Sequence, residues 1–526
     1  MISILTNEAA APAAREFFEL FKTPWEFHRA GAPADILLCA GGEVPSDDAA
    51  LLLIFGGEAL PFDAGTGGGE STATPGWFEV DGLALPIYGR RLVDPASGKT
   101  VCRRGRTQGR PFVRIGFDLF GEIRHLLTAG QPVAHAAVPT LEQHAALVRG
   151  LILEHGLPLV EIPPRPAGHE FIACLTHDVD HAGIRNHKFD HTMFGFLYRA
   201  TAGSLLDVCA GKRSVGQLGR NLLAALRLPL VQAGLARDFW VQFEQYTALE
   251  AGRPSTYYVI PKKGEAGVDG RGRRQALRAA RYEAADLREI LQRLERAGKE
   301  VGVHGLEAWR DSAAGRDERS RIGGLVGQAA TGIRMHWLYF DEAAPGKLEA
   351  AGFLYDSTVG YNETVGYRAG TGQVFKPFTA RQLLELPLHI MDTALFYPSR
   401  MGLSPRQAQA AVQPLIENAR RFGGVLTINW HDRSLAPERL WGDGYTELLG
   451  RLEQAGAWFA TAAQTVAWFR RRRAATFTAP AAGRVRISLP AGGDDLPALR
   501  VRVHRPGGAV AEEMVRDGWE TGRGVI

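Results

Sequence analysis

The chain has 526 residues, of which 45% are hydrophobic and 22% are charged, as in ordinary folded proteins. This composition excludes a mainly disordered, fibrous or collagen-like chain, and the length predicts about three domains. Sixty-one Lys and Arg residues against 57 Asp and Glu leave a formal net charge of +4. That charge is too small for a chain of this size to indicate a nucleic-acid partner.

The cysteines and the N-terminus bear on the cellular compartment. Four widely spaced cysteines form neither a disulfide framework nor a CxxC metal knuckle, which favours a reducing environment. The N-terminus lacks the apolar run of a secretory signal, and the acidic residues Glu8 and Glu16 come early. No run of 18 apolar residues occurs, so we expect no membrane span and a cytoplasmic protein.

The first 165 residues predict an N-terminal α/β domain of unknown role. Short apolar runs at 36–40 and 51–55 indicate buried strands between turns rich in glycine and proline. A helix with one apolar side is expected from Thr140 to about Gly156. The segment 161–168, EIPPRPAG, has the composition of a linker and predicts a domain boundary.

After that boundary, strands and helices alternate, which predicts a parallel α/β sheet or barrel over 166–475. The expected strands include 171–176, 255–261, 300–303, 424–430 and 458–460. The expected helices are 284–297, 347–351, 405–422 and 445–455. A helical insertion with mixed Arg and Leu, at about 182–239, could form a lid, and alternating residues in 476–526 predict a small β-rich appendage.

The strongest chemical signal is THDVDH at 176–181, directly at the end of a predicted buried strand. Residues two apart on a strand share a face, so Asp178 and Asp180 are expected to point into one pocket. Two carboxylates repel each other unless a cation or a division of roles reconciles them. The alternative interpretation is a turn whose Asp and His side chains cap a helix.

Further polar residues follow other predicted strands: His304, Arg334, His336 and His431. A single buried histidine is more often a packing residue than a ligand. Several histidines at equivalent strand ends, together with an aspartate, instead favour a divalent metal site with open positions for water.

The runs ACLTHDVD, EVGVHG and YDST, and a last strand ending in His431, resemble the ordered motifs of the polysaccharide deacetylase (NodB-like, carbohydrate esterase family 4) superfamily. The runs LTHDVDH, GIRMHWLYF and LLELPLHIMDTALFYP resemble a deacetylase-like group with an extra N-terminal domain. The resemblance spans about 171–472. It implies a distorted (β/α) barrel of about seven strands and metal-dependent removal of an acetyl group from a sugar, in surface-polysaccharide biosynthesis.

The resemblance also implies roles for individual residues. Asp178 matches the general base, Asp180 and His304 match metal ligands, and His431 matches the general acid that protonates the leaving amine. Arg334 is expected to keep Asp178 ionised through a two-pronged contact.

One ligand position departs from the motif, because Ala308 stands where the superfamily has a second histidine. We expect His336 to be the third metal ligand. His181, and the pair His187 and His191 in the insertion, are the alternatives.

These observations predict a metal-dependent carbohydrate deacetylase that uses zinc, or else cobalt, nickel or manganese, on an acylated sugar or glycan. With so little net charge, we expect it to select an uncharged or zwitterionic sugar by pocket shape. Ala308 motivates the alternative of an inactive glycan-binding or scaffold protein. A metal amidohydrolase with two histidines on the first strand is disfavoured, because no HxH occurs. The sequence does not indicate an oligomeric state.

Overall fold

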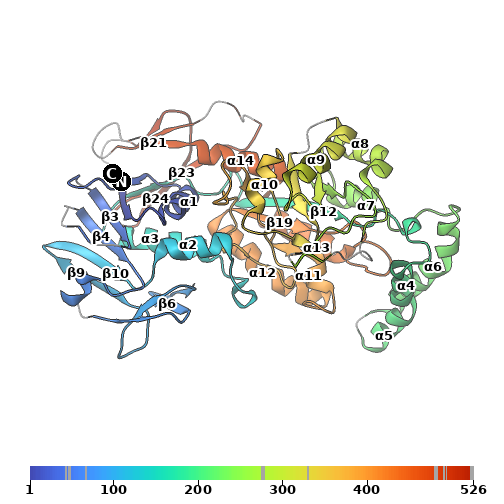
Figure 1. Cartoon of the computed structure of the whole chain (residues 1–526), viewed down its shortest axis with the longest axis horizontal. Helices are drawn as coiled ribbons and strands as arrows, with labels where there is room; N and C mark the ends of the chain where they lie inside the picture. Colours follow the sequence, from blue (N-terminus) through green and yellow to red (C-terminus); the bar gives the residue numbers. More distant parts are fainter. Residues whose placement is uncertain are drawn as a thin grey trace.

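The computed structural model describes residues 1–521 except 33, 42–43, 46–48, 66–67, 212, 270, 274–278, 328–330, 479–483, 490–491 and 493–494. The N-terminal sheet lies at one end of the molecule, a curled sheet with its helices in the middle, and the helical insertion at the far end (Figure 1). Within the described residues, no helix is both long and apolar enough to cross a membrane.

The N-terminal sheet has six strands in the order β2-β1-β3-β4-β10-β9, parallel except for the β9–β10 pair. Its strands are β1 (Ile2–Thr6), β2 (Trp25–Phe27), β3 (Ala34–Ala40), β4 (Ala49–Phe55), β9 (Cys102–Thr107) and β10 (Arg110–Ile115). Helices α1 (Ala11–Phe21), α2 (Leu119–Thr128) and α3 (Thr140–Glu154) share an apolar core with these strands. The predicted strands 36–40 and 51–55 and the helix beginning at Thr140 are therefore confirmed.

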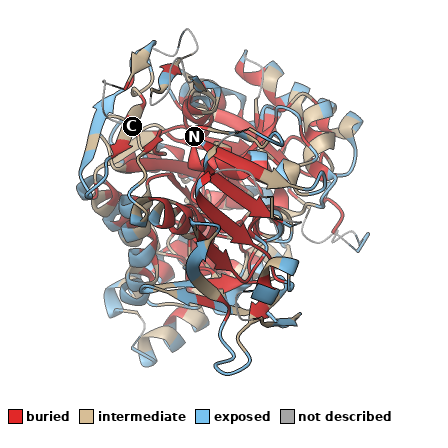
Figure 2. Ribbon diagram, turned by 90° about the vertical axis from the view of Figure 1, so that its left-hand side faces the viewer, coloured by how far each residue is buried: buried red, intermediate tan, exposed pale blue. Residues whose placement is uncertain are grey.

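Two small hairpin-like sheets accompany this layer. They pair β5 (Glu70–Thr72) with β8 (Arg91–Val93), and β6 (Gly76–Val80) with β7 (Leu83–Ile87). Figure 2 shows the strands at the centre of this end of the molecule as buried, with exposed helices and turns around them.

The second sheet has nine strands, all parallel, in the order β17-β16-β15-β14-β13-β12-β19-β18, and β20 also pairs with β12. The strands are β12 (Phe171–Val179), β13 (Thr256–Val259), β14 (Glu300–Gly305), β15 (Gly332–Met335), β16 (Tyr355–Asp356), β17 (Leu384–Glu385), β18 (Ile390–Met391), β19 (Val425–Asn429) and β20 (Ala457–Ala460). The helices around it are α7 (Phe243–Glu250), α8 (Arg288–Arg296), α9 (Ser312–Val326), α10 (Ala344–Ala350), α12 (Pro405–Phe422), α13 (Gly442–Gln454) and α14 (Ala462–Ala474).

The connection between the two edge strands explains the curl of this sheet. β17 and β18 lie at opposite ends of the strand order, yet only residues 386–389 separate them in the chain. So short a segment spans at most about 17 Å, which brings the two edges together. Leu386 N donates to Asp356 O beyond one edge strand, and His389 N donates to Thr427 O beyond the other. The expected barrel is thus a curled parallel sheet whose edges are joined by chain, with no ladder between β17 and β18.

Local sequence accounts for where the elements begin and end. All nine residues of β12 are buried, as expected for an apolar strand covered on both faces. Helix α12 begins after Ser404, whose side chain and that of Gln407 form a capping box, and it ends at Gly423 with φ of 80°. These signals explain why its bounds match the prediction.

The insertion is helical, as predicted. It consists of α4 (His191–Tyr198), a π-helical turn (Arg199–Gly203), α5 (Ser204–Cys209) and α6 (Val215–Gln232). These helices pack on a small core of their own that includes Met193, Phe196, Leu228 and Trp240.

The C-terminal residues form two antiparallel sheets, one of which includes the predicted linker. β11 (Leu159–Glu161) pairs with β23 (Arg500–His504), which pairs with β24 (Val510–Met514). β21 (Thr476–Thr478), β22 (Arg486–Ser488) and β25 (Trp519–Glu520) form the other. Ile162, in the proline-rich segment, is fully buried and its carbonyl oxygen accepts hydrogen bonds from Arg472. The division at 165 and 475 remains a prediction.

Candidate active site

The predicted site residues lie together because they occupy one end of the curled sheet. Asp178 is near the end of β12 and His304 near the end of β14, while His336 directly follows β15 and His431 comes two residues after β19. The carboxyl ends of parallel strands meet at one rim, so residues far apart in sequence converge there.

Asp178 is a buried carboxylate held from both sides. Its Oδ1 accepts a hydrogen bond from Arg334 Nη1 at 2.9 Å, and its Oδ2 accepts one from Asn429 Nδ2 at 2.7 Å. Burial opposes ionisation, but the charge of Arg334, together with those of His304 and His431, outweighs it and holds the pKa of Asp178 below its usual value. The carboxylate is therefore ionised at neutral pH.

Arg334 contacts Asp178 through one nitrogen, so the predicted two-pronged contact was wrong. Its Nη1 also donates to Thr176 Oγ1 at 2.7 Å, while its Nε and Nη2 donate to the carbonyl and hydroxyl oxygens of Ser357, each at 2.9 Å. The guanidinium lies 4.6 Å from the ring centroid of Tyr258. Because Nε and Nη2 are used by Ser357, only Nη1 is left to contact Asp178. The contacts with Ser357, Thr176 and Tyr258 also hold the guanidinium in place.

Asp180, His304 and His336 form a cluster with metal-ligating atoms. Asp180 Oδ1 lies 3.4 Å from His304 Nε2 and 3.7 Å from His336 Nε2. The ligand atoms of all three residues lie within 4.8 Å of one another. Zinc ligands at their usual bond lengths in a tetrahedron lie about 3.3–3.6 Å apart, so these separations suit a divalent ion.

The chemistry of the three donors also fits a metal ion. His304 Nδ1 bonds to Arg334 O at 2.9 Å, which leaves Nε2 as the ligating atom facing Asp180. Burial lowers the pKa of His336 to about 4, so its ring is neutral, as a ligand must be. Asp180 Oδ1 is buried and has no hydrogen-bond partner among the described residues. A cation would satisfy that oxygen.

A turn after β15 orients His336. Trp337 has φ of 62° and Leu338 φ of 55°, in the left-handed region that is uncommon for residues other than glycine. Asn362 Nδ2 donates to Trp337 O at 3.1 Å and holds the turn. The histidine ring thus occupies the place next to Asp180, while Ala308 lies in the apolar core against α9.

His431 lies on the other side of Asp180 and pairs with a second buried carboxylate. Its Nδ1 is 2.6 Å from Asp392 Oδ1, and its Nε2 is 3.9 Å from Asp180 Oδ2. Burial would lower the pKa of His431, but the charge and hydrogen bond of Asp392 raise it to about 10. Nδ1 therefore donates a hydrogen bond to Asp392, and Nε2 also carries a proton, which faces the pocket.

The alternative histidine ligands line the same pocket but form a separate group. His181 Nδ1 is 3.2 Å from His187 Nε2, and His187 Nδ1 is 2.8 Å from Asp190 Oδ2. The exposed His191 contacts Thr192. None of the three histidines belongs to the described cluster of metal-ligating groups around Asp180.

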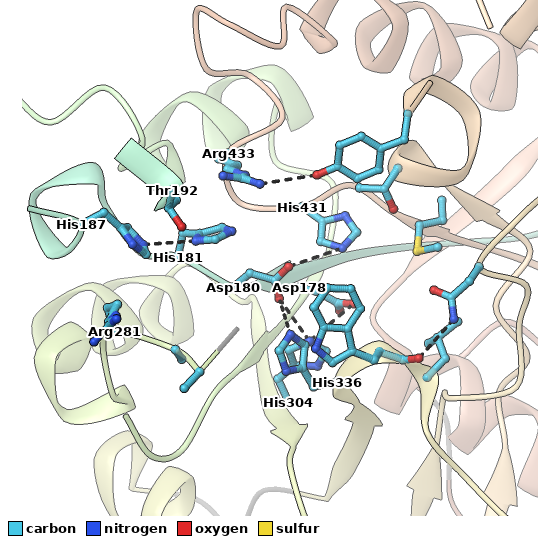
Figure 3. Close-up of a pocket in the computed structure, with 18 of the residues that line it drawn as sticks. Asp178, Asp180, His181, His187, Thr192, Arg281, His304, His336, His431 and Arg433 are labelled. Carbon is cyan, nitrogen blue, oxygen red and sulfur yellow. Dashed lines mark hydrogen bonds and ion pairs between the residues drawn. The ribbon is translucent and has the colours of Figure 1, made fainter. Parts of the chain in front are cut away.

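These residues line a cavity of about 420 Å³, the size of a small-molecule site. Asp178 and Asp180 lie near its middle, with His304 and His336 on one side and His431 on the other (Figure 3). His187, Thr192 and Arg199 of the insertion line it as well, so the predicted lid segment forms part of the wall.

Three partners of the site carried no predicted role: Asn429, Ser357 and Asp392. Asp392 follows β18 as His431 follows β19, so the rule of polar residues after strands could have found it. Ser357 lies in the YDST run of the motif resemblance, so the sequence already indicated it. Asn429 acts on Asp178 through a contact between neighbouring strands, for which the sequence offers no signal.

Comparison of the sequence with protein families and with curated proteins finds no match. Solved structures show a likeness in fold. A structure described as a polysaccharide deacetylase from Mycobacterium smegmatis has 18% identity and a TM-score of 0.37, covering 61% of this chain and 100% of that chain.

Two further structures also match with low identity and a low TM-score. A peptidoglycan deacetylase from Bacillus subtilis has 11% identity and a TM-score of 0.24, covering 58% of this chain and 94% of that one. A branching enzyme of glycoside hydrolase family 57 from Thermococcus kodakaraensis has 10% identity and a TM-score of 0.33, covering 57% and 71%. At these identities and TM-scores, the likenesses assign neither a family nor an activity to this chain.

Proposed function

We propose that this protein is a metal-dependent hydrolase that removes an acetyl group from an N-acylated sugar, in surface-polysaccharide biosynthesis. The observation that carries this proposal is the convergence of Asp180, His304 and His336 beside Asp178 and the His431–Asp392 pair. The motif resemblance of 171–472 supports the same activity.

Asp180, His304 and His336 would hold the ion. When bound, a divalent metal such as zinc polarises the acyl oxygen and makes water a nucleophile near neutral pH. Asp178 is ionised and accepts the proton of the attacking water, because Arg334 and Asn429 hold its carboxylate at the edge of the cavity.

His431 acts as the general acid in this proposal. Its Nε2 faces the cavity with a proton, which it gives to the leaving nitrogen as the carbon–nitrogen bond breaks. A cation at Asp180 opposes the effect of Asp392, so the pKa of His431 in the metal-bound protein lies below its metal-free value of about 10.

The alternative is an inactive glycan-binding or scaffold protein, motivated by Ala308. His336 supplies the imidazole that Ala308 lacks, and this favours the enzyme. The test measures acetate release from a panel of N-acetylhexosamine substrates, with zinc, cobalt, nickel or manganese added. Absence of activity across the panel, together with no bound metal by elemental analysis, would refute the proposal.

Two single substitutions test the ligand set. His336→Ala should lower the affinity for zinc at least about tenfold and abolish acetate release, because it removes one of three protein ligands. The His181→Ala variant, which changes a half-buried histidine of the same pocket, should retain zinc. Retention of zinc by both variants would contradict the assignment of His336.

A further inference from the structure

Four arginines from three segments surround the phenol of Tyr397 at one wall of the cavity. Arg199 comes from the insertion, Arg400 follows α11 (Asp392–Phe396), and Arg433 and Arg439 follow β19. Arg433 Nη2 donates to the Tyr397 hydroxyl at 3.4 Å, and Arg439 donates to it as well. Arg400 and Arg439 lie 5.5 and 4.7 Å from the Tyr397 ring centroid.

These guanidinium groups make no close ion pair with the described carboxylates. In the described part of the chain, no Asp or Glu oxygen lies within 4.0 Å of any of the four. Among the described residues, the Arg400 guanidinium donates hydrogen bonds only to the neutral side chains of Thr393 and Asn362. Glu438 is buried nearby, and its charge acts on Arg199 and Arg439 from a greater distance, while its Oε2 accepts a hydrogen bond from Trp240 Nε1 at 3.4 Å.

Several donors of the cluster also lack partners. Arg199 Nε, Arg433 Nη1 and Arg439 Nε are buried and make no hydrogen bond within the described residues. Leaving charged donors buried and unpaired is costly, which points to a missing acceptor.

The titration of neighbouring groups reports the same positive field. Burial, followed by the charges of Arg433 and Arg439, lowers the pKa of Arg199 to about 10. Burial would raise the pKa of Tyr397, but Arg439 and Arg433 lower it to about 7.

We propose that this arginine cluster binds a phosphoryl group, so that the substrate is an N-acylated sugar bearing a phosphate or diphosphate. The sugar part of this inference rests on the proposed function. Guanidinium groups bind oxyanions through paired hydrogen bonds. A phosphate monoester carries about two negative charges near pH 7, against one for a carboxylate, and so matches several arginines better.

The cluster and the metal-ligating residues share one cavity. Arg199, Arg400 and Arg433 line the same space as Asp180 and His304. Arg433 lies beside His431, whereas Arg281 lies across the pocket (Figure 3). A sugar could therefore present its acylated nitrogen to His431 while its phosphate contacts the cluster.

Isothermal titration calorimetry with pyrophosphate, in the presence of EDTA, tests the cluster without a metal ion. The wild type should bind pyrophosphate, and both Arg400→Ala and Arg433→Ala should weaken binding about tenfold or more. Arg406→Ala, an exposed arginine on α12, is the matched control and should bind as the wild type does. Thermal unfolding establishes that each variant is folded.

Equal affinities in the wild type and in both cluster variants would overturn the inference, as would tighter binding of glucuronic acid than of pyrophosphate. The calorimetric result is independent of acetate release. Acetate release without pyrophosphate binding would therefore refute this inference alone, and pyrophosphate binding without activity or metal would refute the proposed function alone.

A second inference rests on the outer surface of the insertion. Eleven of the 17 exposed large apolar side chains of the described residues belong to it: Phe189, Phe194, Tyr198, Leu205, Leu206, Val215, Leu222, Leu223, Leu226, Leu230 and Leu235. Clusters of this size on a surface mark a binding face.

Helix α6 has two apolar faces, of which only one is covered. Leu228 and Val231 pack into the core of the insertion. Leu222, Leu226 and Leu230, spaced four residues apart, form a stripe that faces solvent. The insertion projects at the end of the molecule away from the N-terminal sheet (Figure 1).

Charge distinguishes the occupant of this face. Residues 182–239 contain eight Lys and Arg and three Asp, a formal net charge of +5. Arg199 lines the cavity, and Arg213 and Arg237 pair with Asp207 and Glu244, so the outer surface carries only part of this charge. Arg220 and Arg227 are exposed on α6 and, seven residues apart, lie on one side of the leucine stripe. Leucines flanked by arginines suit a helix that lies on an anionic bilayer.

We infer that the insertion docks on an anionic lipid surface. The protein should sediment with vesicles of phosphatidylglycerol and phosphatidylcholine. The fraction that sediments with vesicles of pure phosphatidylcholine should be much smaller. Leu226→Asp should abolish retention, whereas Val510→Asp, an exposed residue of β24, should not change it. Equal retention by Leu226→Asp would overturn the inference. The inference would also be overturned if the protein did not bind vesicles and light scattering instead showed a dimer that Leu226→Asp dissociates.

Discussion

At the scale of single residues, each candidate catalytic group depends on a neighbour that holds it. Asp178 is positioned by Arg334 and Asn429, and His431 by Asp392. Asp392 is fully buried, and its Oδ2 also accepts from His431 N at 2.8 Å and from the Ser434 hydroxyl. It is a positioning residue, because it acts on the reaction only through the imidazole.

Asp392→Asn should lower kcat at least about tenfold while KM changes less than about twofold. The amide keeps the shape of the side chain but loses the charge that selects the tautomer with hydrogen on Nδ1. Steady-state kinetics of acetate release checks this. Ser434→Ala removes one hydrogen bond to Asp392 and keeps its charge, so its kcat should stay near that of the wild type. A large change in KM at constant kcat would contradict the assigned role.

At the scale of elements, strands β15 and β16 of the curled sheet pack so closely that β15 requires a glycine at residue 332. A Cβ atom on Gly332, in β15, would lie 1.9 Å from Tyr355 Cζ. Tyr355 is buried, and its hydroxyl donates to Glu300 Oε1 at 2.7 Å, so the ring cannot move without losing that bond. β15 also carries Arg334 and leads to His336.

Gly332→Ala should therefore destabilise the protein by roughly 1–3 kcal/mol, as overpacked cores do. It should also weaken zinc binding. The matched control is Gly324→Ala in α9, where a Cβ would meet nothing within 4 Å. This substitution should raise the free energy of unfolding by about 0.5–1 kcal/mol. Urea unfolding measures both changes. A stabilised Gly332→Ala protein would show that the sheet tolerates a side chain there.

At the scale of the whole molecule, buried polar groups join the N-terminal part to the curled sheet. Arg472 of α14 donates to the carbonyl oxygens of Leu20 and Ile162. Glu142 of α3 accepts from Thr371 Oγ1 at 2.5 Å and from Gly372 N at 3.1 Å through the same oxygen, Oε1. Burial raises the pKa of Glu142 to about 7.

This pKa predicts a pH-dependent stability. A carboxyl group whose pKa is higher in the folded state stabilises the fold fully below its unfolded pKa of about 4.5, and this contribution is lost as the pH rises through about 7. The full effect is on the order of 3 kcal/mol. Glu142→Gln has no proton to lose at this position. Its Tm should therefore fall less than that of the wild type when the pH is raised from 5 to 8.

Differential scanning calorimetry at the two pH values measures this difference. Glu8→Gln, at an exposed position, is the control and should follow the wild type. If Glu142→Gln and the wild type lose the same Tm between the two pH values, the linkage assigned to Glu142 is wrong.

The sequence by itself determined the alternation of strands and helices, and with it most elements of the curled sheet. These depend on local signals, such as the apolar run of β12 and the caps of α12, which act within a few residues. The sequence also indicated the residues that gather at the rim, because polar groups directly after parallel strands must converge. Its prediction of a linker at 161–168 neglected that Leu159–Glu161 pairs with a strand more than 300 residues later.

Only the tertiary structure decided which groups touch. His336 rather than His181 lies beside Asp180 and His304, because a left-handed turn at Trp337 follows β15. The small net charge predicted an uncharged or zwitterionic sugar, yet folding gathers Arg199, Arg400 and Arg433 at one wall of the cavity. A net charge is a sum over the whole chain and carries no position, whereas the electrostatic field in a pocket depends on distance. Contacts between residues distant in sequence therefore set the chemistry of this site.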